Sequence, residues 1–293
     1  MAGPNVSVII PTHGRPDKLL LSLERILQCE PAPAEVIVHV DGDDDGNAAN
    51  VVRSRFSAVR LIETSERMGP GGARNRLVQA ASCPVVASFD DDSYPLDADY
   101  FLRVEELFVR FPEAAIIAAS IFHRDEKLVE LAKRFAWVAD FVGCGCAYRR
   151  SVFLATSGYV PVPTAYGMEE VDMALRLHAD GKKILWTPWL RVFHDTDLKH
   201  HSAVVITAAS ISNLALLGYL RYPPSLWPTC IGQCLSRIIW LLKHCRWRGI
   251  ISGIVMIPKH LRTYREYRDI LPASAIRSFR ALRRSVVETK AFD

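Results

Sequence analysis

Short apolar, β-branched runs alternate with helix-like segments through the first half of the chain, and this alternation limits the fold more than any other feature. The apolar runs lie at Val6–Ile10, Glu35–Val40, Val59–Ile62, Val85–Phe89 and Ala115–Ser120. Helical patterns fill the intervals near residues 16–28, 46–56, 71–82 and 97–111. Most of the apolar runs lack alternating polar residues, as expected of strands that are covered on both faces. The pattern predicts an α/β domain built on a mainly parallel, doubly wound sheet.

Polar clusters follow three of the predicted strands. They are Pro11–Arg15 after the first strand, Asp41–Asp45 after the second and Asp90–Ser93 after the fourth. In doubly wound sheets, ligands bind beyond the carboxyl ends of the strands. Turn chemistry explains one such cluster, because Asp and Gly favour turns. Three clusters at one edge predict a binding site.

The acidic triplet Asp90–Asp92 carries the clearest chemical signal. If the chain is still extended there, Asp90 and Asp92 point to the same side and Asp91 points to the other. Two converging carboxylates are costly without a cation between them, and oxygen ligands favour Mg²⁺ or Mn²⁺. The alternative is an acidic loop that caps the helix predicted to begin near Asp97.

A second acidic cluster, Gly167–Asp172, opens a predicted amphipathic helix. Acidic residues also occur at helix N-termini simply because they complement the helix dipole. Asp172 has a partner at helical spacing in Arg176, whereas Glu170 has no obvious partner. Glu170 is therefore the better candidate for a general base, provided that a closed site raises its basicity.

Two further segments are candidates for the same site. His194 follows the strand-like run Trp189–Phe193, where an imidazole can complete a Mn²⁺ site. The run Gly69–Asn75 precedes a helix, so backbone N–H groups and Arg74 are candidates for phosphate contacts. This run is neither a dinucleotide-binding fingerprint nor a P-loop, because Arg74 stands where the third glycine belongs and no Lys-Ser/Thr pair follows.

The length of 293 residues predicts one catalytic-size domain with an appendage, and we place the boundary near residue 200. With 49% apolar and 23% charged residues, the composition excludes disordered and fibrous classes. The seven cysteines are odd in number and lack zinc-ribbon or thioredoxin spacing, and no secretory signal is evident. We expect a cytoplasmic protein.

The predicted C-terminal extension, residues 201–293, is basic and helical. Residues 237–293 hold 13 Lys/Arg against 4 Asp/Glu. Ala203–Leu220 has no charge but carries several polar residues, so a packed helix is favoured over a membrane span. Leu226–Ile257 is apolar but interrupted by basic residues, which is typical of helices that lie on an anionic membrane surface. The alternatives are an intramolecular helix pair that closes the acceptor side, an oligomer contact, or nucleic-acid binding, which we do not expect.

Taken in order, the motifs resemble the family 2 glycosyltransferases, which have the GT-A fold. The resemblance covers about residues 5–200, and its pieces are VSVIIPTHGRP at 6–16, Asp41, GGARN at 71–75, FDDDS at 89–93, GCGCAYRRSVF at 143–153, GMEEVDMALRL at 167–177 and His194. It implies that Pro11, Thr12 and Asp41 hold the nucleotide base. It also implies that Asp90 and Asp92 form the DxD motif, which binds ribose, diphosphate and metal.

The resemblance extends to the metal and the base. His194 matches the late metal-ligand histidine of the family, which gives a site for Mn²⁺ or Mg²⁺ formed by Asp90, Asp92 and His194. We expect nucleotide-sugar contacts from Pro11, Thr12, Arg15, Asp41, Gly71, Arg74, Asp90 and Asp91. The acidic pair of the family reads Glu-Glu here, with Asp172 two residues on, so Glu170 and Asp172 both remain candidates for the catalytic base.

The expected reaction is inverting transfer of a sugar from a nucleotide-diphosphate donor to a glycan or lipid-linked acceptor, in polysaccharide or glycolipid synthesis. The expected location is the cytoplasm, with peripheral attachment to the inner face of the membrane. The alternative is a non-catalytic nucleotide-sugar-binding or membrane scaffold protein of the same fold. A nucleotidyltransferase is disfavoured, because it would normally carry a Gly-rich basic loop where this chain has Pro11–Arg15.

Overall fold

The computed structural model describes residues 3–42, 47–124, 126–128, 130–164, 166, 168–196, 203–285 and 287–289. Three features discussed above therefore lie outside the described residues. They are Asp43–Asp45 of the second polar cluster, Gly167 before the acidic helix, and the predicted domain boundary at residues 200 and 201.

Strands and helices alternate along the first half of the chain, as the sequence predicts. The strands are β1 (Val6–Thr12), β2 (Glu35–Asp41), β3 (Arg60–Thr64), β4 (Val85–Phe89), β5 (Ser93–Pro95), β6 (Ala114–Phe122), β7 (Phe135–Val138), β8 (Gly145–Arg149), β9 (Lys183–His194) and β10 (Val287–Thr289). The α-helices are α1 (Pro16–Leu27), α2 (Asn47–Arg55), α3 (Gly69–Ala80), α4 (Tyr100–Arg110), α5 (Arg150–Leu154), α6 (Glu169–Ala179), α7 (Val204–Arg221), α8 (Trp227–Lys243), α9 (Ile250–Thr263) and α10 (Ala273–Leu282), with 3₁₀ turns η2 (Pro224–Leu226) and η3 (Arg265–Tyr267). The five strands and four helices predicted for the first half of the chain are confirmed to within a few residues.

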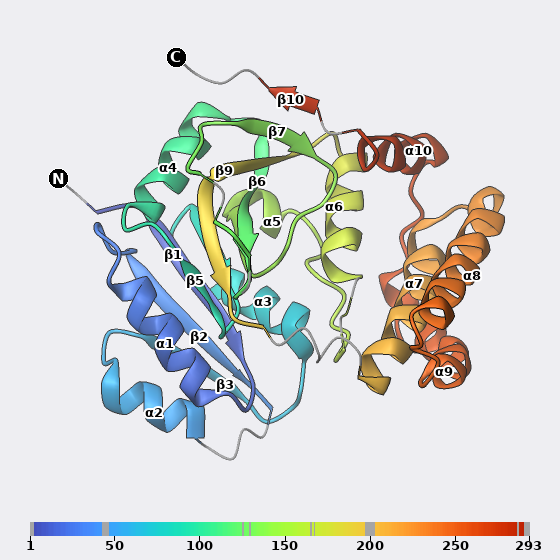
Figure 1. Cartoon of the computed structure of the whole chain (residues 1–293), viewed down its shortest axis with the longest axis horizontal. Helices are drawn as coiled ribbons and strands as arrows, with labels where there is room; N and C mark the ends of the chain where they lie inside the picture. Colours follow the sequence, from blue (N-terminus) through green and yellow to red (C-terminus); the bar gives the residue numbers. More distant parts are fainter. Residues whose placement is uncertain are drawn as a thin grey trace.

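The strands form one twisted sheet in the order β10-β7-β9-β6-β8-β4-β1-β2-β3, and β5 pairs with β9 beside this path (Figure 1). The β4-β1-β2-β3 half is parallel throughout. The other half is mixed, because β8 lies antiparallel between β4 and β6. The prediction of a mainly parallel sheet is therefore confirmed for β4, β1, β2 and β3. In the other half, β8 introduces antiparallel pairs with β4 and β6.

Alternate residues of the central strands face two separate hydrophobic cores. In β1, Val6, Val8 and Ile10 point into the core covered by α1, α2 and α4, whereas Ile9 points into the core covered by α3, α5 and α6. This two-sided burial explains the continuous apolar runs in the sequence. It also leaves the carboxyl ends of β1, β2 and β4 as the polar edge of the sheet.

The C-terminal helices form a lobe beside α6 (Figure 1). In the described part of the chain, α7 is the one helix long and apolar enough to cross a membrane, and 67% of it is buried inside the structure, as expected of a packed helix. Helices α8 and α9 both pack against α7. The segment is not wholly helical, because β10 pairs with β7, and Ile276 and Phe279 of α10 join the core beside α6.

A buried ion pair joins the lobe to the α/β body. Arg221, at the end of α7, donates from Nε to Asp172 Oδ1 of α6 at 2.5 Å and from Nη2 to Oδ2 at 3.1 Å. Arg176 donates to the same carboxylate at 3.0 Å. Asp172 and Arg221 are almost completely buried. The pair therefore fixes α7 against α6.

We predict that Arg221→Met lowers the free energy of unfolding by about 3 kcal/mol, because a buried carboxylate loses one of its two cations. Urea unfolding followed by circular dichroism measures the change. The matched control is Arg53→Met, which removes an exposed pair with Glu63 and should cost less than about 1 kcal/mol. Equal costs for the two substitutions would contradict the role of the buried pair.

Candidate active site

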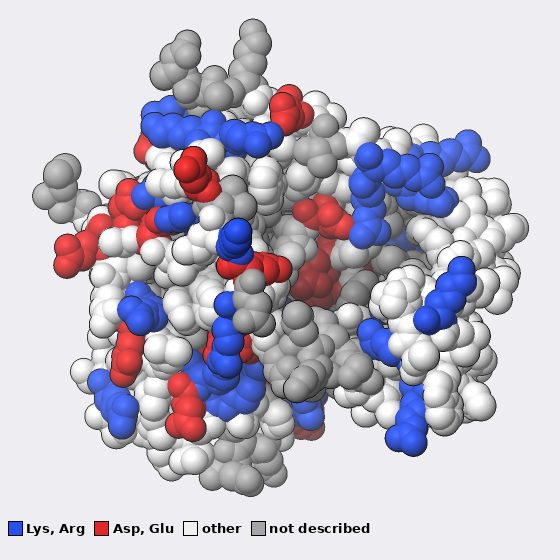
Figure 2. Space-filling model, in the orientation of Figure 1, with Lys and Arg blue, Asp and Glu red and all other residues white. Residues whose placement is uncertain are grey.

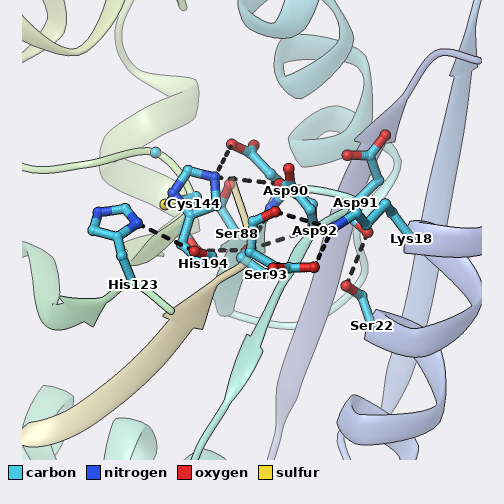
Figure 3. Close-up of polar contacts among 12 residues, drawn as sticks. Lys18, Ser22, Ser88, Asp90, Asp91, Asp92, Ser93, His123, Cys144 and His194 are labelled. Carbon is cyan, nitrogen blue, oxygen red and sulfur yellow. Dashed lines mark hydrogen bonds and ion pairs between the residues drawn. The ribbon is translucent and has the colours of Figure 1, made fainter. Parts of the chain in front are cut away.

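The acidic triplet lies where β4 ends, and two of its carboxylates converge on His194 (Figure 3). His194 Nε2 lies 3.2 Å from Asp92 Oδ1 and 4.0 Å from Asp90 Oδ2. The chain turns after Phe89 rather than remaining extended, yet Asp90 and Asp92 still face the same group. Burial acts to lower the pKa of His194, but the hydrogen bond to Asp92 and the charge of Asp90 outweigh it and raise that pKa.

Strand pairing brings His194 to the triplet. His194 is the last residue of β9, and it pairs with Ser93 of β5 directly after the triplet. Cys144, which the sequence interpretation missed, places its Sγ 3.6 Å from His194 Nδ1. Asp90, Cys144 and His194 each offer a ligand atom, and these atoms lie within 4.8 Å of one another. The sequence signal for Cys144 is its place in the GCGCAYRRSVF segment at 143–153.

Asp91 points away from this group, toward β1 and α1. Its Oδ2 accepts a hydrogen bond from Thr12 Oγ1 at 2.9 Å, and its carboxylate pairs with Arg15. Burial raises the pKa of Asp91 to about 7, although Arg15 acts in the opposite direction. Arg15 also donates to Asp92 Oδ2 at 2.7 Å, and half of its side chain is exposed. Thr12 and Arg15, both expected donor contacts, thus lie at the triplet.

Arg74 is a buried bridge rather than an exposed phosphate ligand. Its guanidinium pairs with Asp90 and donates to Glu169 Oε1 at 3.1 Å, and its Nε donates to Ser88 Oγ at 3.1 Å. The side chain is 2% exposed. Arg74 of α3 therefore ties the triplet at the end of β4 to the start of α6.

The two glutamates that open α6 differ in their contacts. Glu169 is buried against Arg74, whereas Glu170 is partly buried and its Oε1 accepts from the backbone N–H of Gly143 at 3.3 Å. Burial raises the pKa of both carboxyls, and the charge of Arg74 opposes this. A Cβ at Gly143 would lie 2.9 Å from Arg74 Cζ and 3.0 Å from Glu170 Oε1, so glycine permits the close approach. Glu170 thus borders the triplet.

Asp172, the other candidate for the base, lies outside this cluster. Both of its oxygens accept hydrogen bonds from Arg221 and Arg176, and its side chain is fully buried. The structure therefore separates the two candidates.

The remaining expected donor contacts have structural partners. Asp41, at the end of β2, accepts hydrogen bonds from the backbone N–H groups of Met68 at 2.7 Å and Gly69 at 2.8 Å, so it caps the start of α3. A Cβ at Gly71 would lie 2.9 Å from Glu169 Oε2, which explains glycine there by packing. Pro11 is buried within β1. The anion-binding end of α3 is thus occupied by Asp41.

A second group of charges, also missed from the sequence, holds the end of β9 in place. Asp195 pairs with Lys18 of α1 and with Arg124, and its backbone N–H donates to Asp92 O at 2.8 Å. His123 Nδ1 lies 3.1 Å from His194 O. These contacts fix His194 relative to the triplet.

We predict that Asp41→Ala lowers the free energy of unfolding by about 1–3 kcal/mol without any ligand, because a buried N–H group and a partly buried one lose their acceptor. Chemical denaturation measures the change. The control is Asp17→Ala at an exposed position of α1, with an expected cost below about 1 kcal/mol. If Asp41 served nucleotide binding alone, stability of the free protein would be unchanged and the capping role would be wrong.

Comparison with known proteins gives the family and the fold of this chain. The sequence model described as Glycosyl transferase family 2 matches residues 7–155. The succinoglycan biosynthesis protein ExoO of Rhizobium meliloti (strain 1021) is 33% identical over 89 residues, which cover 30% of this chain and 26% of that protein. The uncharacterized protein y4gI of Sinorhizobium fredii (strain NBRC 101917 / NGR234) is 20% identical over 222 residues, 65% of this chain and 24% of that protein. The chain thus matches about a quarter of each of these relatives.

Two solved structures share the fold. GalNAc-T7 with UDP, GalNAc and Mn²⁺ superposes with a TM-score of 0.59 at 14% identity, over 75% of this chain and 48% of that one. Mannosyltransferase PcManGT from Pyrobaculum calidifontis, in complex with GDP-Man and Mn²⁺, superposes with a TM-score of 0.59 at 17% identity, over 96% of this chain and 80% of that one. The fold is the GT-A fold, and because the family match covers just over half of the chain, this protein belongs to glycosyl transferase family 2.

Proposed function

We propose that this protein is a metal-dependent, inverting glycosyltransferase that moves a sugar from a nucleotide-diphosphate donor to an acceptor hydroxyl. The observation that carries the proposal is the convergence of Asp90, Asp92 and His194 beside Glu170. A cation site and a base of raised pKa at one edge of the sheet are the two parts that this reaction needs.

The residues present fit a hard divalent cation. Five carboxylates gather at this edge, namely Asp90, Asp91, Asp92, Glu169 and Glu170. In the described part of the chain, the cations that pair with them are Arg15, Arg74 and the His194 imidazole. Carboxylate oxygens with one imidazole are ligands that suit Mn²⁺ or Mg²⁺. Held by Asp90, Asp92 and His194, such an ion would neutralise the charge that develops on the departing diphosphate.

Glu170 is the base that the geometry supports. Burial favours its protonated form and so makes its carboxylate a stronger base than an exposed glutamate. It accepts the proton of the acceptor hydroxyl as that oxygen attacks the anomeric carbon, and a single displacement inverts that carbon. Asp172 is a poorer candidate for the base, because its buried carboxylate oxygens already accept hydrogen bonds from Arg176 and Arg221.

Arg15 and Thr12 support the proposed binding of the nucleotide-diphosphate sugar. The Arg15 guanidinium is half exposed and lies on Asp91 and Asp92, which places a cation where a diphosphate would approach the triplet. Thr12 holds Asp91 from the end of β1. The acceptor class is a glycan or lipid-linked sugar in polysaccharide or glycolipid synthesis, which agrees with the name of the ExoO relative.

We predict that Glu170→Gln lowers the rate of transfer by about 10²–10⁴-fold, because the general base is lost while the donor site is kept. A thermal-shift screen of UDP-, GDP- and TDP-sugars with Mn²⁺ first identifies the donor. Transfer assays and calorimetric titration of that nucleotide then compare the variant with Glu24→Gln, an exposed control on α1.

The pH dependence gives an independent check. The base acts in its deprotonated form, so transfer by the wild type should rise with pH, with a midpoint above the usual glutamate value of 4.5 because burial raises the pKa of Glu170. Full transfer by Glu170→Gln, or loss of nucleotide binding together with transfer, would reject Glu170 as the base.

A further inference from the structure

The outward face of α8 is apolar. Side chains at intervals of three and four residues share this face and are 44–60% exposed, namely Trp227, Ile231, Leu235, Ile239 and Leu242. The opposite face carries the buried residues Cys230 and Leu241, which pack toward α7. Helix α8 therefore carries apolar side chains on its outward face as well as on its buried face. A helix on the surface of a soluble protein normally presents polar residues on its outward side.

The same arrangement continues into α9. Ile250 and Gly253 are buried, and a Cβ at Gly253 would lie 2.7 Å from Ala208 O, so this face is pressed against α7. Ile251 is 78% exposed and Val255 is 70% exposed, and Trp247 in the connection between α8 and α9 is 62% exposed. The outward apolar side chains are not needed to pack the lobe, because the inward ones already cover α7.

The charge of α7, α8, α9 and the connections between them is of one sign. Residues 203–265 contain no Asp or Glu, and residues 227–265 contain seven Lys/Arg. Figure 2 shows the lobe as basic and uncharged side chains, whereas acidic side chains lie on the α/β body and in the hollow between the two. Arg237 lies over the Trp240 ring at 4.8 Å, and Arg248 lies over the Trp247 ring at 5.5 Å. Basic groups thus accompany the exposed indoles.

We propose that the outward faces of α8 and α9 dock this protein on the surface of an anionic lipid bilayer. Exposed Trp, Ile and Leu side chains enter the headgroup boundary, while Lys and Arg reach the phosphates. At 17 and 14 residues, α8 and α9 are shorter than the roughly 20 residues of a typical spanning helix, so they lie on the surface. A second copy of the chain fits less well, because a two-fold contact would bring basic residues together without an acidic partner.

Vesicle co-sedimentation of the full chain tests this proposal without donor or acceptor, so its outcome is independent of the proposed reaction. The probes are vesicles of phosphatidylcholine alone and of phosphatidylcholine mixed with phosphatidylglycerol. We expect retention on the mixed vesicles, weaker retention on the neutral ones, and release as salt is added.

Two double variants weaken this surface: one replaces apolar side chains by acidic ones, and the other reverses two basic charges. Ile251→Asp with Val255→Asp and, separately, Lys243→Glu with Arg248→Glu should each lower the partition onto mixed vesicles by about tenfold or more. The matched controls are Val109→Asp, at a 76% exposed position of α4, and Arg55→Glu with Lys182→Glu at exposed positions of the body. These controls should bind as the wild type does. Unchanged unfolding midpoints show that each variant is folded.

Several results would overturn the proposal. One is that the wild type is not retained on mixed vesicles, and another is that the variant Ile251→Asp with Val255→Asp is retained as well as the wild type. A third is that the wild type forms a dimer in vesicle-free solution whereas this variant is a monomer. The last result would assign the face to a second copy. Retention that needs an added acidic protein would assign it to a protein partner.

Discussion

The concentration of negative charge at the carboxyl ends of the central strands is the constraint on which the rest of the site depends. Five carboxylates meet there because β4 delivers Asp90–Asp92 and α6 delivers Glu169 and Glu170 to the same edge. Burying charges is costly unless they are paired, and Arg15 and Arg74 do not balance five acids. Burial raises the pKa of Glu169 and Glu170, and the excess of carboxylates over arginines fits the site to a divalent cation.

Features that depend on local patterns could be predicted from the sequence. Continuous apolar runs identified the strands β1, β2 and β4, since burial on both faces leaves that signature. The polar residues that follow β1 and β4 lie together at the candidate site. The convergence of Asp90 and Asp92 on His194 agrees with the expected ligand set. The resemblance to the glycosyltransferase family strengthened the link between the acidic triplet and His194, because their separation of about a hundred residues in the sequence does not show that they are close in space.

Features that depend on tertiary contacts were not predictable. The strand β8, which directly follows Cys144, is antiparallel to its neighbours. Its local sequence does not distinguish an antiparallel strand from a parallel one. Arg74 follows glycines as a phosphate-binding residue would, but the fold buries it between Asp90 and Glu169. Asp172 matched a base by position, and its partner Arg221 lies 49 residues away. In each case, a distant partner determines what the side chain does.

The most direct test of the account is electron spin echo spectroscopy of Mn²⁺ bound to the protein with a nucleoside diphosphate. Modulation from a directly coordinated imidazole nitrogen is predicted for the wild type, and His194→Gln should abolish it, whereas His178→Gln at a distant position of α6 should not. Bound Mn²⁺ without nitrogen modulation, or a signal that persists in His194→Gln, would contradict the claim that the charge at this edge is balanced by a cation held between the acidic triplet and His194.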